Sequence, residues 1–183
     1  MSRLPGLRVV KAAGASALVI ALAGCAEMGL VTPAAVAELK PTKDSTVSGI
    51  VNFYPRGSKV VVVARVAGLK PGMHGFHIHE KGDCSDPGFK NAGAHVHTKT
   101  PVVHGLLNVD ENDSGDLPNL YVAPDGTATV ELYSTFVSLK GEGGRPALLD
   151  ADGSALVVHT SPDDYKSQPI GGAGARIACA VIH

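Results

Sequence analysis

Hydrophobic and polar residues alternate along much of this chain in short runs that are typical of β-strands. The clearest run covers residues 127–136, in which apolar Ala128, Val130 and Leu132 alternate with polar or aromatic neighbours. Because successive side chains of a strand point to opposite faces, this run predicts a strand with one buried face. Further short runs rich in β-branched residues predict strands over residues 47–53, 59–66, 74–80, 120–122, 155–159 and 176–182.

Turn residues separate the predicted strands, and no segment has a convincing helical period or an internal repeat. About eight short strands predict an all-β fold, an eight-stranded antiparallel Greek-key sandwich or flattened barrel. Two long polar stretches, residues 81–118 and 160–175, interrupt the strands. We expect them to be functional loops, because loops of this length inside a compact domain usually carry function.

The first residues have the features of an export signal. Arg3, Arg8 and Lys11 precede an apolar run, residues 12–24, that is too short to span a membrane and ends in small residues. No later stretch is long and apolar enough to span a membrane. The predicted parts are a lipoprotein signal peptide over residues 1–24, a tether over residues 25–43 and a folded domain over residues 44–183.

The predicted signal ends in Leu22-Ala23-Gly24-Cys25, which resembles the lipobox of bacterial lipoproteins. The cysteine of that motif is lipidated, so we expect Cys25 to anchor the chain to a membrane without spanning it. An ordinary signal peptide with a chance cysteine is the alternative. Ala26 is not the aspartate linked to inner-membrane retention in some bacteria, so we favour a periplasm-facing position on the outer membrane.

Composition limits the size and the partners of the protein. The 183 residues fit one domain. Removal of residues 1–24 takes three of the 16 basic residues and none of the 17 acidic ones, which leaves a formal net charge of −4. This balance argues against nucleic-acid binding, which calls for a basic surface. A local positive charge must therefore attract any anionic substrate.

Two cysteines remain once Cys25 is assigned to lipid. Cys84 and Cys179 form an even pair in an exported chain, so a disulfide is the default expectation. Closure of a loop of nearly a hundred residues is worth roughly 4 to 5 kcal/mol in the chain-entropy model. Because Cys84 lies five residues after His79, the bridge would attach the first long loop to the last strand.

Histidines are concentrated in one part of the chain. Six of the eight lie between positions 74 and 104, namely His74, His77, His79, His95, His97 and His104. His77 and His79 are two apart in a predicted strand, so their imidazoles lie on the same face and form half of a metal site. Clustered imidazoles with carboxylates nearby are a standard metal-binding arrangement.

Four motifs together carry a family resemblance. Residues 74–84 read HGFHIHEKGDC, residues 115–120 read GDLPNL, residues 157–159 read VVH and residues 174–179 read GARIAC. With these motifs the chain resembles the bacterial copper/zinc superoxide dismutases from about position 46 to its end. The resemblance implies copper and zinc as cofactors, and a monomer or homodimer. It also implies that two superoxide anions become dioxygen and hydrogen peroxide while copper cycles between Cu(II) and Cu(I).

The same resemblance implies the metal ligands. Copper would be bound by His77, His79, His95 and His159, and imidazole nitrogens suit Cu(II). His95 matches the bridging histidine, whose imidazolate joins copper to zinc and delivers a proton to the departing peroxide. The zinc ligands would be His95, His104, Asp116 and the residue at position 113.

The zinc half departs from the family pattern at that last ligand. The family has a histidine three residues before the zinc aspartate, whereas this chain has Asp113. Aspartate is a competent zinc ligand. Because a softer nitrogen is replaced by a harder oxygen, we expect weaker zinc binding. His97 lies in a run that is one residue longer than usual before His104, and it is an alternative substitute ligand.

Two positive residues correspond to positions that guide the substrate. By the resemblance, Arg176 is the arginine beside copper that attracts and orients a small anion. Lys166 in the second loop is a candidate for further steering.

Two buried polar residues are expected to support the ligands. Asp163 matches the aspartate that ties a copper histidine to a zinc histidine, which here would be His77 and His104. His74 is expected to orient the copper set without ligating. Two alternatives to the copper/zinc enzyme remain open, a copper-only dismutase and a non-catalytic copper-binding lipoprotein; a purely structural sandwich is disfavoured because all four copper positions and Arg176 are present.

Overall fold

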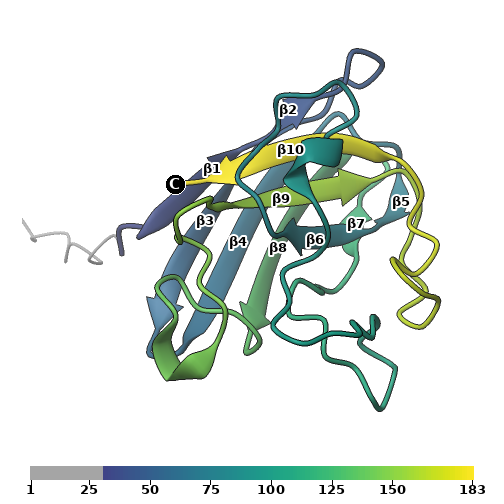
Figure 1. The fold of residues 1–183 in the computed structure, drawn as a ribbon. Coiled ribbons are helices and arrows are strands. Elements are labelled where there is room, and N and C mark those ends of the chain that lie inside the picture. Colours follow the sequence, from purple (N-terminus) through teal and green to yellow (C-terminus); the bar gives the residue numbers. More distant parts are fainter. Residues whose placement is uncertain (1–30) are drawn as a thin grey trace, which may run out of the picture. The chain divides into compact units, whose positions relative to one another are not determined.

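The fold is all-β in a computed structural model that describes residues 31–183 (Figure 1). The strands of the described part are β1 (Ala35–Glu38), β2 (Lys40–Pro41), β3 (Ser48–Arg56), β4 (Lys59–Ala67), β5 (Gly72–His74), β6 (Phe76–His79), β7 (Leu120–Val122), β8 (Thr127–Ser134), β9 (Ser154–His159) and β10 (Arg176–Ile182). Two short 3₁₀ turns, η1 (Lys90–Ala92) and η2 (Glu142–Gly144), lie in the connecting loops.

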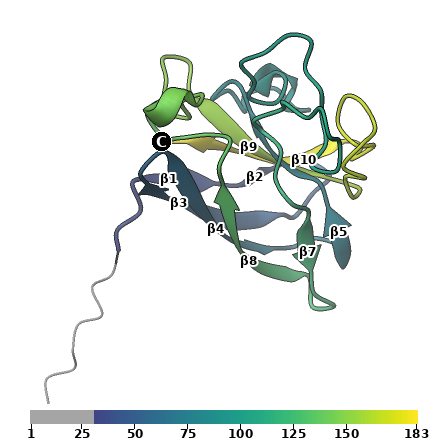
Figure 2. The ribbon, with the colours of Figure 1, turned by 90° about the horizontal axis from the view of Figure 1, so that it is seen from below.

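Two four-stranded antiparallel sheets face each other, and Figure 2 shows them as two layers. One sheet has the strand order β1-β3-β4-β8 and the other β2-β10-β9-β6, while β5 and β7 form a separate two-stranded sheet. The predicted eight-stranded antiparallel Greek-key sandwich is therefore confirmed, with β5 and β7 as an addition.

The core lies between the sheets, where alternate residues such as Phe53, Val62, Phe76 and Ile78 are fully buried. Strand β9 is buried along its whole length because both of its faces are covered. Leu156 and Val158 belong to the central core, whereas Ala155 and Val157 pack with Phe89 in a second cluster beneath the first long loop. This loop is thus held against the outer face of β9 and β10.

Two predictions about element boundaries are wrong. The tether was predicted to reach residue 43, but residues 35–41 form β1 and β2 within the two sheets. Val36 exchanges backbone hydrogen bonds with His183, so this segment also holds the C-terminus. The predicted strand over residues 74–80 is two strands, because the chain leaves the small sheet at Gly75 and enters the larger sheet as β6.

The predicted signal peptide and Cys25 lie outside the described residues. Within residues 31–183 there is no helix with the length and apolar character needed to cross a membrane.

Candidate metal centre

Strand β6 organises the site, because its free edge binds two segments of the first long loop (residues 80–119). The Val96 amide donates to the Ile78 carbonyl at 2.9 Å, and the Ile78 amide donates to the Gly115 carbonyl at 2.9 Å. A Cβ atom at position 115 would meet the Ile78 oxygen at 2.2 Å, so only glycine permits this approach. These contacts bring His95 and Asp116 beside the two histidines of β6.

Four histidines converge on one point, and their ligand atoms lie within 4.8 Å of one another. Phe76 and Ile78 face the core, so His77 and His79 share the opposite face of β6, as the period-two argument predicted. The other two members come from the first loop and from the end of β9, and the complete set is His77, His79, His95 and His159.

One nitrogen of each of these histidines is buried and has no hydrogen-bond partner among residues 31–183: His77 Nδ1, His79 Nε2, His95 Nε2 and His159 Nε2. His79 and His159 donate from Nδ1 to the Gly93 and Gly174 carbonyls at 3.0 and 3.1 Å. A carbonyl can only accept, so the proton is on Nδ1 and the Nε2 lone pair is free. Four free nitrogen lone pairs directed at one point fit a copper ion.

The second group consists of two histidines and two aspartates, again with ligand atoms within 4.8 Å of one another. His95 Nδ1 lies 2.9 Å from Asp113 Oδ2 and 3.1 Å from Asp116 Oδ1. His104 Nδ1 lies 2.7 Å from Asp116 Oδ1 and 3.4 Å from Asp113 Oδ2. Two nitrogens and two carboxylate oxygens fit a zinc ion. His95 belongs to both groups, so the two predicted metal sites meet at its ring.

The electrostatics of the two groups are opposite. Burial lowers the pKa of His77 and His79 and lowers that of His159 to about 3, so these rings are neutral near pH 7. Burial also opposes the charged form of His104, but hydrogen bonds to Asp113, Asp116 and Asp163 outweigh it and raise its pKa to about 11. Protons on the rings thus balance the carboxylates of the second group, and a bound cation can take the place of these protons.

Asp163 connects the two groups. Its Oδ2 accepts a hydrogen bond from His77 Nε2 at 2.9 Å, and its Oδ1 accepts one from His104 Nε2 at 3.1 Å. Burial would raise the pKa of this carboxyl, but the bonds from His104 and His77 outweigh it and lower the pKa. An ionised Asp163 thus fixes one ring from each group.

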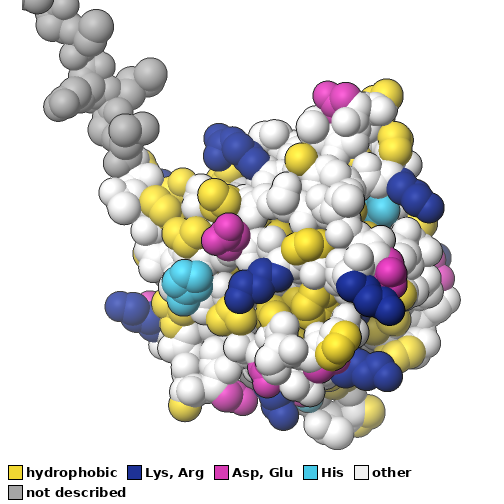
Figure 3. Space-filling model, turned by 90° about the horizontal axis from the view of Figure 1, so that it is seen from above, with side chains coloured by type: hydrophobic (Ala, Val, Ile, Leu, Met, Phe, Trp, Pro, Cys, Tyr) yellow, Lys and Arg dark blue, Asp and Glu magenta, His cyan; other side chains and the backbone are white. Residues whose placement is uncertain are grey.

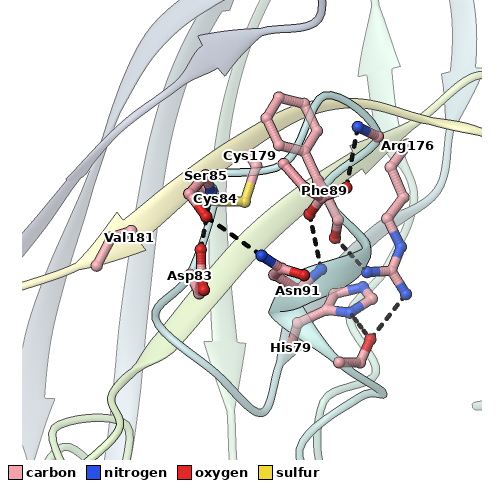
Figure 4. The surroundings of a disulfide bond; sticks show 12 residues. His79, Asp83, Cys84, Ser85, Phe89, Asn91, Arg176, Cys179 and Val181 are labelled. Carbon is pink, nitrogen blue, oxygen red and sulfur yellow. Dashed lines mark hydrogen bonds between the residues drawn. A yellow bond between two sulfur atoms is a disulfide. The ribbon is translucent and has the colours of Figure 1, made fainter.

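Arg176 begins β10 opposite His159 and is held by two carbonyls of the first loop. Its Nη1 donates to the Phe89 oxygen at 2.5 Å and its Nη2 to the Gly93 oxygen at 2.7 Å. In Figure 4, the His79 ring and the guanidinium reach the same Gly93 oxygen. The Gly93 carbonyl therefore fixes the positions of both the His79 ring and the Arg176 guanidinium.

The predicted disulfide between Cys84 and Cys179 is present, with the two Cα atoms 5.8 Å apart. It anchors the segment that carries Phe89 onto β10, as Figure 4 shows. The disulfide thus anchors the loop whose Phe89 carbonyl accepts a hydrogen bond from Arg176.

A cavity of about 360 Å³ opens beside the four histidines. His79, His95 and Arg176 contribute its polar lining, and Val102, Pro169 and Ile170 contribute apolar walls. Lys166 does not line this cavity. On the face drawn in Figure 3, basic and acidic side chains are interspersed, and neither kind forms a large patch.

Two other histidines lie near the groups without joining them. His97 directs Nδ1 to the His95 carbonyl at 2.8 Å and is in neither ligand group of the described residues. His74 is buried, with its ring nitrogens 2.7 Å from the His159 carbonyl and 2.9 Å from the Lys70 carbonyl. It therefore contacts the backbone of a ligand and does not point at either group.

Sequence reasoning missed Glu111, the third acidic side chain at the second group. Its Oε2 is buried without a partner, and burial together with the charges of Asp116 and Asp113 raises its pKa. Sequence reasoning also missed the carbonyl contacts to Arg176, because backbone acceptors leave no signal in residue identity.

Known sequences give a consistent result. A sequence profile of the family Copper/zinc superoxide dismutase (SODC) matches residues 47–182. A protein of Caulobacter vibrioides named as a copper–zinc superoxide dismutase is 62% identical over 139 residues, which are 76% of this chain and 80% of that protein. A second one so named, from Aquifex aeolicus, is 42% identical over 147 residues, 80% of this chain and 84% of that protein.

Solved structures agree with the sequence matches. A superoxide dismutase-like protein from Bacillus subtilis superposes with a TM-score of 0.72 at 34% identity. The match covers 80% of this chain and 96% of that one.

Proposed function

The chain belongs to the copper/zinc superoxide dismutase family, and we propose that it is a dismutase whose copper ligands are His77, His79, His95 and His159. Copper and zinc are the cofactors of this family, and superoxide is its substrate. The observation that carries the assignment of ligands is the set of four buried nitrogens, one from each histidine, that have no hydrogen-bond partner in the described part of the chain and lie within 4.8 Å of one another.

When bound, copper would supply one-electron chemistry, by which one superoxide is oxidised to dioxygen and a second is reduced and takes two protons to become hydrogen peroxide. The chain supplies the geometry for this exchange. His77, His79 and His159 each have their second ring nitrogen bonded to a fixed acceptor, so their free nitrogens are held in place.

His95 is the residue that can move a proton. Its Nε2 faces the copper group and its Nδ1 lies between Asp113 and Asp116. When Nε2 is not coordinated it can hold a proton and donate it to the reduced oxygen species, the general-acid role that imidazole suits. We assign zinc to His95, His104, Asp113 and Asp116, where it would keep the ring oriented.

Arg176 is assigned the role of attracting and orienting the anion. Its guanidinium lines the cavity beside His79 and His95, and two carbonyls hold it there. In a protein with a formal net charge of −1, a fixed local cation is the means by which an anion is drawn to the site. His74 and Asp163 are assigned supporting roles, because each contacts a ligand without joining the ligand groups.

The place of action is inferred to be the periplasm. A disulfide at Cys84–Cys179 is suited to an oxidising compartment. The motif that ends at Cys25 supports a lipid anchor, with the outer membrane as the favoured site. Radiolabelled palmitate incorporation that is lost in Cys25→Ala would support the anchor, and incorporation that persists would contradict it.

The function is tested by superoxide decay with the purified, copper-loaded and zinc-loaded chain. We expect a second-order rate near the diffusion limit, about 10⁸ to 10⁹ M⁻¹ s⁻¹. His159→Ala should lose this activity, whereas His183→Ala, a change at an exposed histidine outside both ligand groups, should retain it. Decay no faster than that caused by free copper, despite stoichiometric copper binding, would overturn the dismutase and favour a copper-binding lipoprotein.

A copper-only dismutase is the second candidate, favoured by one observation. Asp113 occupies the position at which the family has a histidine, so the second group offers two nitrogens and two oxygens. Full activity of copper-loaded protein without zinc would select this candidate.

A further inference from the structure

The two long loops meet along a seam next to the zinc group. The second loop (residues 160–175) contacts the first loop at the segment that follows His104. The Leu107 amide donates to the Tyr165 carbonyl at 3.2 Å. Gly105 has φ +114°, and a Cβ atom there would meet the Tyr165 oxygen at 2.1 Å. The backbones are therefore in direct contact, and only glycine fits at this point.

Gln168 makes the most specific contact across this seam. Its Oε1 accepts a hydrogen bond from the His104 amide at 2.9 Å, and its Nε2 donates to the His104 carbonyl at 2.9 Å. The second hydrogen of Nε2 is donated to the Lys166 carbonyl at 3.0 Å. The side-chain amide thus pairs with both backbone polar groups of one residue that is 64 positions away in the chain.

His104 is thereby held by hydrogen bonds at its backbone and at its ring. Gln168 binds the backbone of His104. The His104 ring is hydrogen-bonded to Asp163 through Nε2, and its Nδ1 lies beside Asp116. A ligand that is already held in its binding position does not need to be ordered when the metal binds. This matters at a zinc group in which Asp113 replaces an imidazole and the donor set suits zinc less well.

We propose that Gln168 is a positioning residue for the zinc-side histidine His104, and that it couples the second loop to zinc retention. This inference rests on the zinc site assigned above. It predicts that loss of the Gln168 amide loosens zinc without altering the copper group, because the hydrogen bonds of this amide go to the backbone of His104 and Lys166.

The test measures the zinc dissociation constant of the full chain by competition with a chromophoric chelator. Gln168→Ala should weaken zinc binding about tenfold, the lower end of the range for groups that orient metal ligands. Gln168→Glu keeps the acceptor for the His104 amide and loses the donor to the carbonyl, so it should lie between Gln168→Ala and the wild type. Copper affinity should stay within twofold in both.

Ser167→Ala is the matched control, because Ser167 is an exposed neighbour in the same loop whose hydroxyl donates to Asp164 and not to His104. It should bind zinc as the wild type does. Cobalt bound in place of zinc adds a spectroscopic readout, and its visible bands should shift in Gln168→Ala alone. A purely structural role would lower the unfolding midpoint and leave the zinc constant and the cobalt bands unchanged.

A zinc constant within twofold of the wild type in both Gln168 variants would overturn the inference alone. A wild-type chain that binds no zinc would overturn it together with the assigned zinc site. Copper-dependent superoxide decay, measured on the same preparations, distinguishes these failures from failure of the dismutase itself.

Discussion

Asp113 lies in the second ligand group, at a position where the family resemblance leads us to expect a histidine. Its Oδ2 lies beside both His95 and His104, so the side chain has kept a ligand's place with a different donor atom. Replacement of an imidazole nitrogen by a carboxylate oxygen would add negative charge and exchange a softer donor, which suits zinc, for a harder one.

Asp113→His should therefore bind zinc more tightly than the wild type, by about tenfold. Chelator competition measures the change, and Asp110→His, at an exposed aspartate three positions earlier, controls for an added histidine. Equal or weaker zinc binding by Asp113→His would show that the carboxylate is the better ligand in this setting.

Arg176 supports a second prediction at the same scale. Arg176→Ala should lower kcat/KM for superoxide about tenfold and should flatten its dependence on ionic strength, because electrostatic steering is screened by salt. Arg65→Ala, which removes an exposed charge on β4, is the control. Similar salt dependence in wild type and Arg176→Ala would contradict the guiding role.

Residue identity, spacing and the family resemblance led to eight ligand positions, with His95 counted in each group, and the structure brings these side chains together, while their binding of metal stays a prediction. They did so because side chains that bind metals are few in type and the strand period fixes their face. Gln168 and the Gly93 carbonyl could not be predicted in this way. Gln168 bonds to the backbone of a residue 64 positions away, and the Gly93 carbonyl accepts from a guanidinium 83 positions away, so in each contact one partner is a backbone group that has no distinctive residue pattern.

At the scale of elements, β6 and its free edge determine where the loops go. The edge accepts hydrogen bonds and donates them to two loop segments, and the contact at Gly115 leaves no space for a side chain. Alternation predicted the long strands well. It failed for β1 and β2, because runs of four and two residues are too short to show a period.

Gly115→Ala should disturb both metal groups, since the added Cβ would lie 2.2 Å from the Ile78 oxygen and 2.9 Å from the His95 Cβ. Overpacking of this kind costs about 1 to 3 kcal/mol, and the unfolding free energy should fall accordingly. Gly88→Ala is the control, because its nearest contact would be an ordinary 3.7 Å. Elemental analysis after dialysis reports the bound metals, and full occupancy in Gly115→Ala would refute the argument.

The disulfide links the stability of the first loop to the position of Arg176. A Cys84→Ala, Cys179→Ala double variant should lose roughly 4 to 5 kcal/mol of unfolding free energy in the chain-entropy model. It should also show the weakened salt dependence expected of Arg176→Ala, because the Phe89 carbonyl is no longer anchored. Denaturant unfolding and stopped-flow superoxide decay measure the two effects. A variant that loses stability but keeps wild-type salt dependence would show that the loop holds Arg176 without the bridge.

At the scale of the whole molecule, the sandwich holds the first long loop beside β6 and β9 so that the ligands of both groups meet at His95. His77, His79 and His159 of the copper group are neutral and buried, while the zinc group carries carboxylates that a cation can balance. Asp163 and His95 connect them, so the two groups form one centre. The all-β class followed from the strand pattern, whereas the meeting of the loops depends on contacts between residues far apart in the sequence.

The most direct test of this account is superoxide decay by the purified chain loaded with copper alone and then with copper and zinc. We expect fast decay with copper, a further rise when zinc is added, and no such rise in Asp113→Ala, which lacks one zinc ligand. If decay never exceeds that of free copper although copper is bound stoichiometrically, the two groups do not form a dismutase centre, and the account is wrong.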